Sequence, residues 1–245
     1  MSFYDFITSL TKEDLEELTN EFNRLKNKIP TYTFSKIGYK DLRKLVDIER
    51  VFDNNIFNSW FNCDIALATE DISFLTNLLN QEIDLIRIYS EEDLKIHFLS
   101  PILNRVKFKS LESKVRDFYE ETLFYETDNF ILRGVTDFVV AKGFEYPETP
   151  YFFIQEFKKG LQYSNPEPQL LAELISAVEL NKFKQMTGAF VVGENWNFVI
   201  LDKLGQNKYQ YVISRTFNAT NTDDLMSIYK NLLVVKRNIT LNLFQ

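Results

Sequence analysis

Hydrophobic residues recur every three or four positions through the first third of the chain, which is the spacing of one face of an α-helix. Two series carry this pattern: Leu15, Leu18, Phe22 and Leu25, then Leu42, Leu45, Ile48 and Val51. Pro30 with residues 31–38 interrupts the pattern, and Asp53-Asn54-Asn55 interrupts it again. The spacing therefore predicts a helical section over residues 11–80 that is broken twice.

A further helix is predicted to begin after Tyr89. Ser90 is a residue type that caps helix N-termini. Four residues then fall on one stripe: Glu92, Ile96, Leu99 and Leu103. Because proline has no backbone N–H, the helix needs a kink or a break at Pro101. A carboxylate thus starts an otherwise apolar face.

The pattern then changes to short runs that are rich in β-branched and aromatic residues. Residues 130–141 and 151–158 form two such runs, and a turn region with Gly and Pro separates them at 143–150. We expect two adjacent strands, arranged as a hairpin.

The last part of the chain predicts two more helices around a second hairpin. Turn-forming residues precede a helix at 169–180, a hairpin covers 188–193 and 196–202, and an amphipathic helix covers 222–235. The order from Ser90 onward is helix, strand, strand, helix, strand, strand, helix. This order predicts a mixed α/β sandwich behind the helical front section.

Composition limits the chemistry that the chain can support. A chain of 245 residues, 45% of them hydrophobic, can bury one sizeable core. Cys63 is the only cysteine and His97 the only histidine, which excludes a disulfide framework, a zinc ribbon and any site built from several histidines. A metal ion here would need oxygen ligands.

The net charge of −7 argues against a surface that is basic throughout. One stretch differs locally, because residues 104–116 hold five cations and one acid. This stretch is either a strip that contacts phosphates or an ordinary solvated surface. Residues 3–10 are short, contain Asp5 and follow no basic segment, so they resemble neither a signal peptide nor a membrane anchor. We therefore expect a cytoplasmic protein without a membrane partner.

Three charged residues of the first predicted hairpin form the candidate catalytic centre. Asp137 lies inside an apolar strand, where an ionised side chain is costly unless a partner or a metal compensates it. Glu156 and Lys158 are two residues apart on the next strand, so strand alternation puts both on one face. Two carboxylates can hold a hard divalent ion, and a nearby ammonium can orient or activate a water molecule for phosphodiester hydrolysis.

These residues resemble the motif of the PD-(D/E)xK nuclease superfamily. Thr136-Asp137 matches the motif aspartate, with threonine in place of the usual proline, and Glu156-Phe157-Lys158 matches the E-x-K element. The resemblance covers residues 89–203 and is greatest to uncharacterised bacterial members of the restriction-enzyme type. It implies a restriction-endonuclease-like αβββαβ core, Mg²⁺ or Mn²⁺ as cofactor, and nucleic acid, DNA in the first place, as substrate.

The resemblance also assigns two further site residues. Glu92 matches an acidic residue that completes the metal site in some members, and Gln169 matches a glutamine found after the E-x-K strand in certain subgroups. The expected metal ligands are therefore Asp137, Glu156 and Glu92. Each extra residue has a second explanation: an acid is favoured in a first helical turn by the helix dipole, and a glutamine at a helix N-terminus can bond free backbone groups.

We divide the chain into a helical section at 1–85, a nuclease-like core at 86–215 and a closing helical segment at 216–245. Three functions stay open. The first is an active deoxyribonuclease in a restriction, repair or mobile-element context. The second is a nucleic-acid-binding module that has lost turnover, and the third is an assembly subunit, which the acidic charge and the 23 Phe and 12 Tyr would suit. A homodimer or a partner subunit that supplies specificity fits each of them.

Overall fold

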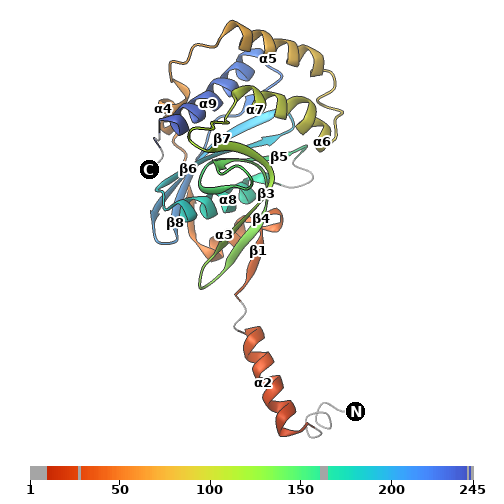
Figure 1. The fold of residues 1–245 in the computed structure, drawn as a ribbon, viewed down its shortest axis with the longest axis vertical. Coiled ribbons are helices and arrows are strands. Elements are labelled where there is room, and N and C mark those ends of the chain that lie inside the picture. The colour runs from red at the N-terminus through yellow and green to blue at the C-terminus, as the bar shows by residue number, and fades with distance from the viewer. Residues whose placement is uncertain (1–9, 27–28, 161–164, 242, 244–245) are drawn as a thin grey trace.

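A computed structural model describes residues 10–26, 29–160, 165–241 and 243. One curled mixed sheet lies at its centre, with helices on both faces, and helix α2 (Lys12–Lys26) extends away from this body (Figure 1). The other helices are α3 (Tyr39–Leu45), α4 (Asn58–Phe61), α5 (Thr69–Glu82), α6 (Glu91–Leu94), α7 (Ser100–Val106), α8 (Pro166–Asn181) and α9 (Thr222–Thr240). Three shorter helical turns are η1 (Phe34–Lys36), η2 (Asn54–Phe57) and the π-helical η3 (Lys95–Leu99).

Nine strands make up the described sheet. They are β1 (Thr31–Thr33), β2 (Asp47–Arg50), β3 (Val115–Glu126), β4 (Ile131–Lys142), β5 (Glu148–Lys158), β6 (Gln185–Val192), β7 (Asn195–Gly205), β8 (Lys208–Ile213) and β9 (Phe217–Asn218). Their order is β1-β4-β5-β6-β7-β8-β2, with β3 on the other edge of β4 and β9 beside the start of β7. Strands β5 and β6 are parallel, and helix α8 is the crossover that such a pair requires.

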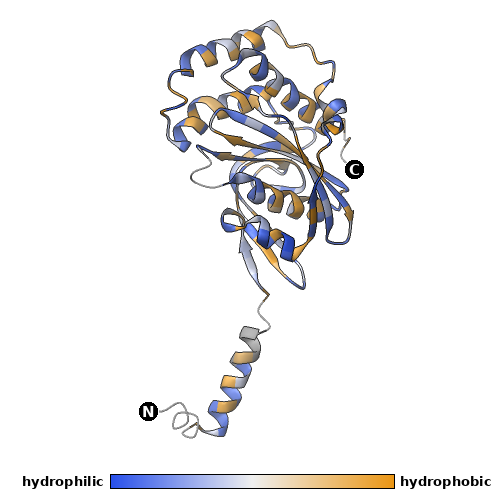
Figure 2. Ribbon diagram, turned by 180° about the vertical axis from the view of Figure 1, so that it is seen from behind, coloured by the Kyte–Doolittle hydropathy of each residue, from blue (hydrophilic) through white to orange (hydrophobic). Residues whose placement is uncertain are grey.

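Both faces of the sheet are buried, each in its own hydrophobic cluster. Successive residues of β4 point to opposite faces, so Phe138 packs in the cluster formed with α5, α7 and α9, while Val139 packs in the cluster formed with α3 and α8. In Figure 2 hydrophobic residues run along the central strands, whereas α2 alternates between hydrophobic and hydrophilic positions. Leu15 and Leu18 of α2 are exposed.

The hairpins and the later helices predicted from the sequence are confirmed. β4 pairs antiparallel with β5, β6 pairs antiparallel with β7, and α8 and α9 cover the two predicted helical segments. Ser90 caps α6 as expected, accepting a hydrogen bond from the Asp93 N–H. Pro101 lies in the first turn of α7, directly after the π-helical turn η3, so the helix changes type just before the proline.

Two parts of the prediction are wrong. Ile48 does not continue the helix that contains Leu42 and Leu45, because it lies in strand β2, which pairs with β8. The predicted order also contains no strand at residues 115–126, where the structure has the long strand β3, whose residues alternate irregularly between buried and exposed. Whether such a segment forms a strand depends on its pairing with a neighbouring strand, and the spacing of residues along the sequence does not reveal that pairing.

The sections 1–85 and 216–245 contribute to the same core as the segment between them. Trp60 and Leu75 pack with Ile228 in one cluster, and Phe34 and Leu42 pack with α8 in the other. The boundaries of the three sections stay predictions. Among the described residues no helix has both the length and the apolar character needed to cross a bilayer. Residues 3–9 of the segment considered as a possible leader lie outside the described residues.

Strand β4 has a gap along one edge, and the candidate site lies at this gap. Strand β1 pairs with residues 131–133 of β4, and β5 pairs with residues 138–142. Phe34, which is fully buried, fills the space beside Gly134. A Cβ atom at Gly134 would lie 2.8 Å from the Phe34 ring, so only glycine fits the gap without displacing that ring.

We therefore expect Gly134→Ala to destabilise the fold by about 1 to 3 kcal/mol, the usual cost of overpacking a core. Urea unfolding followed by fluorescence measures the change. Gly205→Ala is the matched control, because the nearest atom to its added Cβ is 4.0 Å away. Equal stability of the two variants would contradict this explanation of the gap.

Candidate active site

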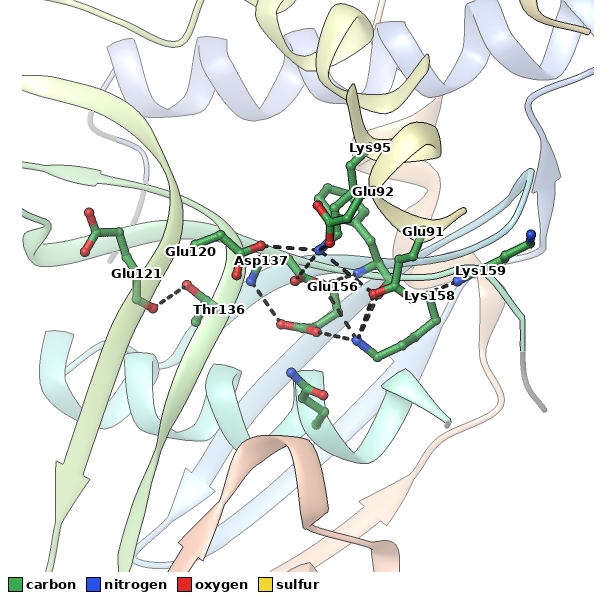
Figure 3. Close-up of polar contacts among 12 residues, drawn as sticks. Glu91, Glu92, Lys95, Glu120, Glu121, Thr136, Asp137, Glu156, Lys158 and Lys159 are labelled. Carbon is green, nitrogen blue, oxygen red and sulfur yellow. Dashed lines mark hydrogen bonds and ion pairs between the residues drawn. The ribbon is translucent and has the colours of Figure 1, made fainter. Parts of the chain in front are cut away.

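The candidate carboxylates meet where the backbone pairing of β4 and β5 stops. Phe138 and Gln155 form the last backbone pair, and the side chains of Asp137 and Glu156 continue the contact beyond it. The Asp137 N–H donates to Glu156 Oε1 at 3.3 Å, and the Phe157 N–H donates to Asp137 Oδ2 at 2.7 Å. Both carboxylates lie on the sheet face that α8 covers, and Figure 3 shows them side by side.

Lys158 brings a positive charge to both carboxylates. Its Nζ lies 3.7 Å from Glu156 Oε2, 3.9 Å from Asp137 Oδ2 and 4.0 Å from Glu91 Oε1 (Figure 3). The ammonium also donates to the Phe157 carbonyl at 2.9 Å, which fixes its position above the strand end. The structure thus brings together the three residues that the sequence singled out.

Helix α6 contributes Glu91 to this cluster, whereas the sequence had pointed to Glu92. Glu91 Oε2 accepts a hydrogen bond from the Lys159 N–H at 3.0 Å, which ties α6 to the end of β5. The Glu92 side chain is 72% exposed, and its Oε1 lies 3.6 Å from Lys95 Nζ. Successive helical residues point about 100° apart, so Glu91 faces the strand end and Glu92 faces outward.

Lys95 is a site residue that sequence reasoning missed. Its ammonium lies 3.0 Å from Asp137 Oδ1 and 3.3 Å from Glu120 Oε1, with Glu91 and Glu92 also within 4.0 Å (Figure 3). Burial alone would lower the pKa of Lys95, but the charge and hydrogen bond of Asp137 raise that pKa above its ordinary value. The spacing of Glu91 and Lys95, one helical turn apart, was a signal in the sequence for this ion pair.

Helix α8 places a third buried carboxyl beside Glu156. Glu173 is fully buried, and the Gln169 Nε2 donates to its Oε1 at 3.2 Å. Gln169 is itself buried, and this hydrogen bond to Glu173 is what connects it to the cluster. Glu173 was noted in the sequence only for its position one turn after Gln169, and it carried no predicted role.

The two buried glutamates are neighbours, and the pKa of each is raised. Burial raises the pKa of Glu156 well above its ordinary value, and the carboxyls of Glu173 and Asp137 raise it further. Burial likewise raises the pKa of Glu173 to about 8. The Oε2 atoms of both residues are buried and have no hydrogen-bond partner within the described chain. We therefore expect the pair to hold a proton in the folded protein when no metal ion is bound, with Glu156 as the donor to Glu173.

The side chains present fit a hard divalent ion in their chemistry. Asp137 and Glu156 offer carboxylate oxygens, and Glu156 Oε2 is buried without a partner. Nevertheless, among the residues that the structure describes, no three His, Cys, Asp or Glu side chains are gathered in the geometry of metal ligands. The ammonium of Lys95 instead occupies the position next to Asp137 Oδ1, which an ion would have to share or take over.

The cationic stretch 104–116 is not a uniform phosphate-binding strip. Arg105 Nε is 2.6 Å from Asp71 Oδ1, and the Arg116 guanidinium stacks over the Phe118 ring at 4.0 Å. These two cations thus have structural partners. Contact of the remaining lysines with phosphate stays a prediction.

Removing the Lys95 charge tests what holds Asp137. We expect Lys95→Met to lower stability in EDTA by about 3 kcal/mol, because it leaves a nearly buried carboxylate without its closest cation. Millimolar Mg²⁺ should restore part of this loss, and chemical denaturation with and without Mg²⁺ measures both effects. Lys44→Met, at a lysine whose side chain is 70% exposed, is the control and should change stability by less than about 0.5 kcal/mol. An unchanged Lys95 variant would show that the ion pair does not matter to the fold.

No family model matches the sequence, and no curated protein matches it.

Proposed function

We propose that this chain is a metal-dependent nuclease of the PD-(D/E)xK type that hydrolyses phosphodiester bonds, with DNA as its substrate. The observation that carries the proposal is the meeting of Asp137 and Glu156 at the splayed ends of β4 and β5, with the Lys158 ammonium within 4 Å of both. Structural ion pairs of this kind are costly to bury, and such costs are typical of functional sites.

The order of the elements supports the same proposal. Helices α6 and α7 are followed by β3, β4, β5, then α8 and β6, which is the αβββαβ order of the restriction-endonuclease-like core. The parallel pairing of β5 with β6 across α8 agrees with that arrangement. A restriction, repair or mobile-element context suits such an enzyme.

Each residue of the cluster then has a chemical role. Asp137 and Glu156 would hold Mg²⁺ or Mn²⁺, and the ion would supply charge that stabilises the pentavalent transition state. Lys158 orients the attacking water and stabilises developing charge on the phosphate. Gln169 positions Glu173, and Glu91 fixes the height of α6 above the strand end through the Lys159 N–H.

A second candidate is a catalytically silent subunit that binds nucleic acid or assembles with a partner. The observation that favours it is Lys95, whose ammonium lies 3.0 Å from Asp137 Oδ1 and so already compensates the charge of that carboxylate. An internal cation of this kind would make an added ion unnecessary for stability.

Incubation of the purified chain with supercoiled plasmid, linear duplex and single-stranded DNA separates these functions. Cleavage that requires Mg²⁺ or Mn²⁺ and stops in EDTA supports the nuclease. Retardation of DNA on gels without cleavage supports the silent binding module, and neither effect supports an assembly subunit. A parallel RNA substrate determines which nucleic acid is preferred.

A further inference from the structure

A polar cavity lies on the sheet face opposite to α8, between α4, β9 and α9. It has a volume of about 430 Å³, within the range of small-ligand pockets. Its walls carry three aromatic rings, two cations and several amide or hydroxyl groups. The lining residues are Phe57, Asn58, Phe61, Asn62, Arg215, Phe217, Ser227, Lys230 and Asn231.

The cations of this cavity stand out in a chain whose net charge is −7. The Arg215 guanidinium stacks over Phe217 at 3.7 Å, and its Nη1 is 2.9 Å from Asp224 Oδ1. This double contact holds the guanidinium plane at the cavity while its remaining N–H groups can bind an anion. Lys230 is exposed at the same rim. Two cations around one pocket favour a ligand that carries phosphate.

The aromatic and amide groups favour a planar polar ring beside that phosphate. Phe61 stacks on Phe57 with ring centroids 4.8 Å apart, and it is less deeply buried than Phe57 and Phe217. A base stacked on an aromatic ring gains about 1 to 3 kcal/mol. Asn231 is almost fully buried, and its Nδ2 has no hydrogen-bond partner within the described chain. Exposed Asn58 and Asn62 offer further donors and acceptors.

The strand register places this cavity at the same end of the sheet as the candidate active site. Lys158 pairs with Val192, Val192 pairs with Asn195, and Asn195 pairs with Asn218, next to Phe217. Three strand spacings span roughly 14 Å, which is about four nucleotides of a stacked strand at 3.4 Å each. A strand crossing the end of the sheet would therefore reach from one site to the other.

We propose that this cavity binds one nucleotide, with its phosphate on Arg215 and Lys230 and its base against Phe61. The nucleotide is either a free nucleotide or one unit of a single nucleic-acid strand. Only the nucleic-acid strand rests on the proposed nuclease function. Binding of the nucleotide itself requires no cleavage, so the two proposals fail independently.

Calorimetric titration of the full chain with dAMP, deoxyadenosine and inorganic phosphate tests the site. We expect dAMP to bind more tightly than either half, and Arg215→Gln and Lys230→Gln each to weaken it by about tenfold. Lys184→Gln, an exposed lysine at the opposite end of the sheet, is the matched control and should change nothing. Asn62→Ala, at an exposed position, and Phe61→Leu should weaken dAMP but not phosphate.

The proposal is overturned if dAMP does not bind at 10 mM, a Kd that corresponds to a binding free energy of about 3 kcal/mol. It is also overturned if phosphate alone binds as tightly as dAMP, or if neither cation variant changes the affinity for dAMP. A single-stranded decamer distinguishes the two sources. Tighter binding of the decamer than of dAMP, lost in Arg215→Gln, assigns the site to a nucleic-acid strand; tighter binding of dAMP assigns it to the free nucleotide. If dAMP binds and no DNA is cleaved, the nucleotide site stands and the nuclease proposal fails.

Discussion

Asp137→Asn is expected to abolish both divalent-ion binding and cleavage, while Lys158→Ala is expected to abolish cleavage alone. Asparagine keeps an oxygen that accepts from the Phe157 N–H, so the fold should survive, but it removes the charge that would hold an ion. Cleavage should fall by several orders of magnitude, and added Mg²⁺ should rescue it little. Lys158→Ala leaves both carboxylates in place, and a positioned proton-transfer group is worth about 10² to 10⁴-fold.

Calorimetric titration with Mg²⁺ and Mn²⁺, run beside a plasmid-cleavage assay, separates the two outcomes. Asp128→Asn, at an exposed turn, and Lys142→Ala, at the exposed end of β4, are matched controls and should behave as wild type. Loss of ion binding in Lys158→Ala would show that the lysine holds the site together instead of acting on substrate. Wild-type protein that binds neither ion at millimolar concentration with DNA present would favour the silent module.

Much of the later fold could be predicted because local spacing and final structure agree there. The predicted helix at 169–180 falls inside α8, whose apolar residues mark it clearly, although the turn-forming residues before it prove to be the cap Asn165 and the first helical residues from Pro166. The segment around Ile48 shows the reverse. Its helical spacing continues that of α3, yet pairing with β8 makes it a strand. Tertiary pairing outweighed local preference at this point.

The candidate site could be predicted only as far as strand alternation reaches. Alternation along β5 puts Glu156 and Lys158 on one face, and the structure agrees. The choice between Glu91 and Glu92 depends on the rotation of a four-residue helix over the sheet, which spacing does not fix. Lys95 directly follows this helix, so its contact with Asp137 depends on the same rotation. Such contacts between elements depend on how the elements pack, so they became visible only in three dimensions.

The pH dependence of stability in EDTA should reveal the buried proton between Glu156 and Glu173. A carboxyl whose pKa is raised on folding binds its proton more tightly in the folded state, so its contribution is fully present below about pH 4.5 and is lost as the pH rises towards 8. Each pKa unit corresponds to about 1.4 kcal/mol, so wild-type stability should fall by several kcal/mol over this interval. Glu173→Gln keeps the shape and the neutral state of the protonated acid, which should flatten the curve and make the variant more stable than wild type by about 2 to 4 kcal/mol at pH 8.

Urea unfolding between pH 5 and 8 measures this difference, with exposed Glu126→Gln as the control that should follow the wild-type curve. Parallel curves for wild type and Glu173→Gln would mean that both glutamates are ionised in the folded protein, with the Lys158 ammonium close to Glu156 compensating their charge.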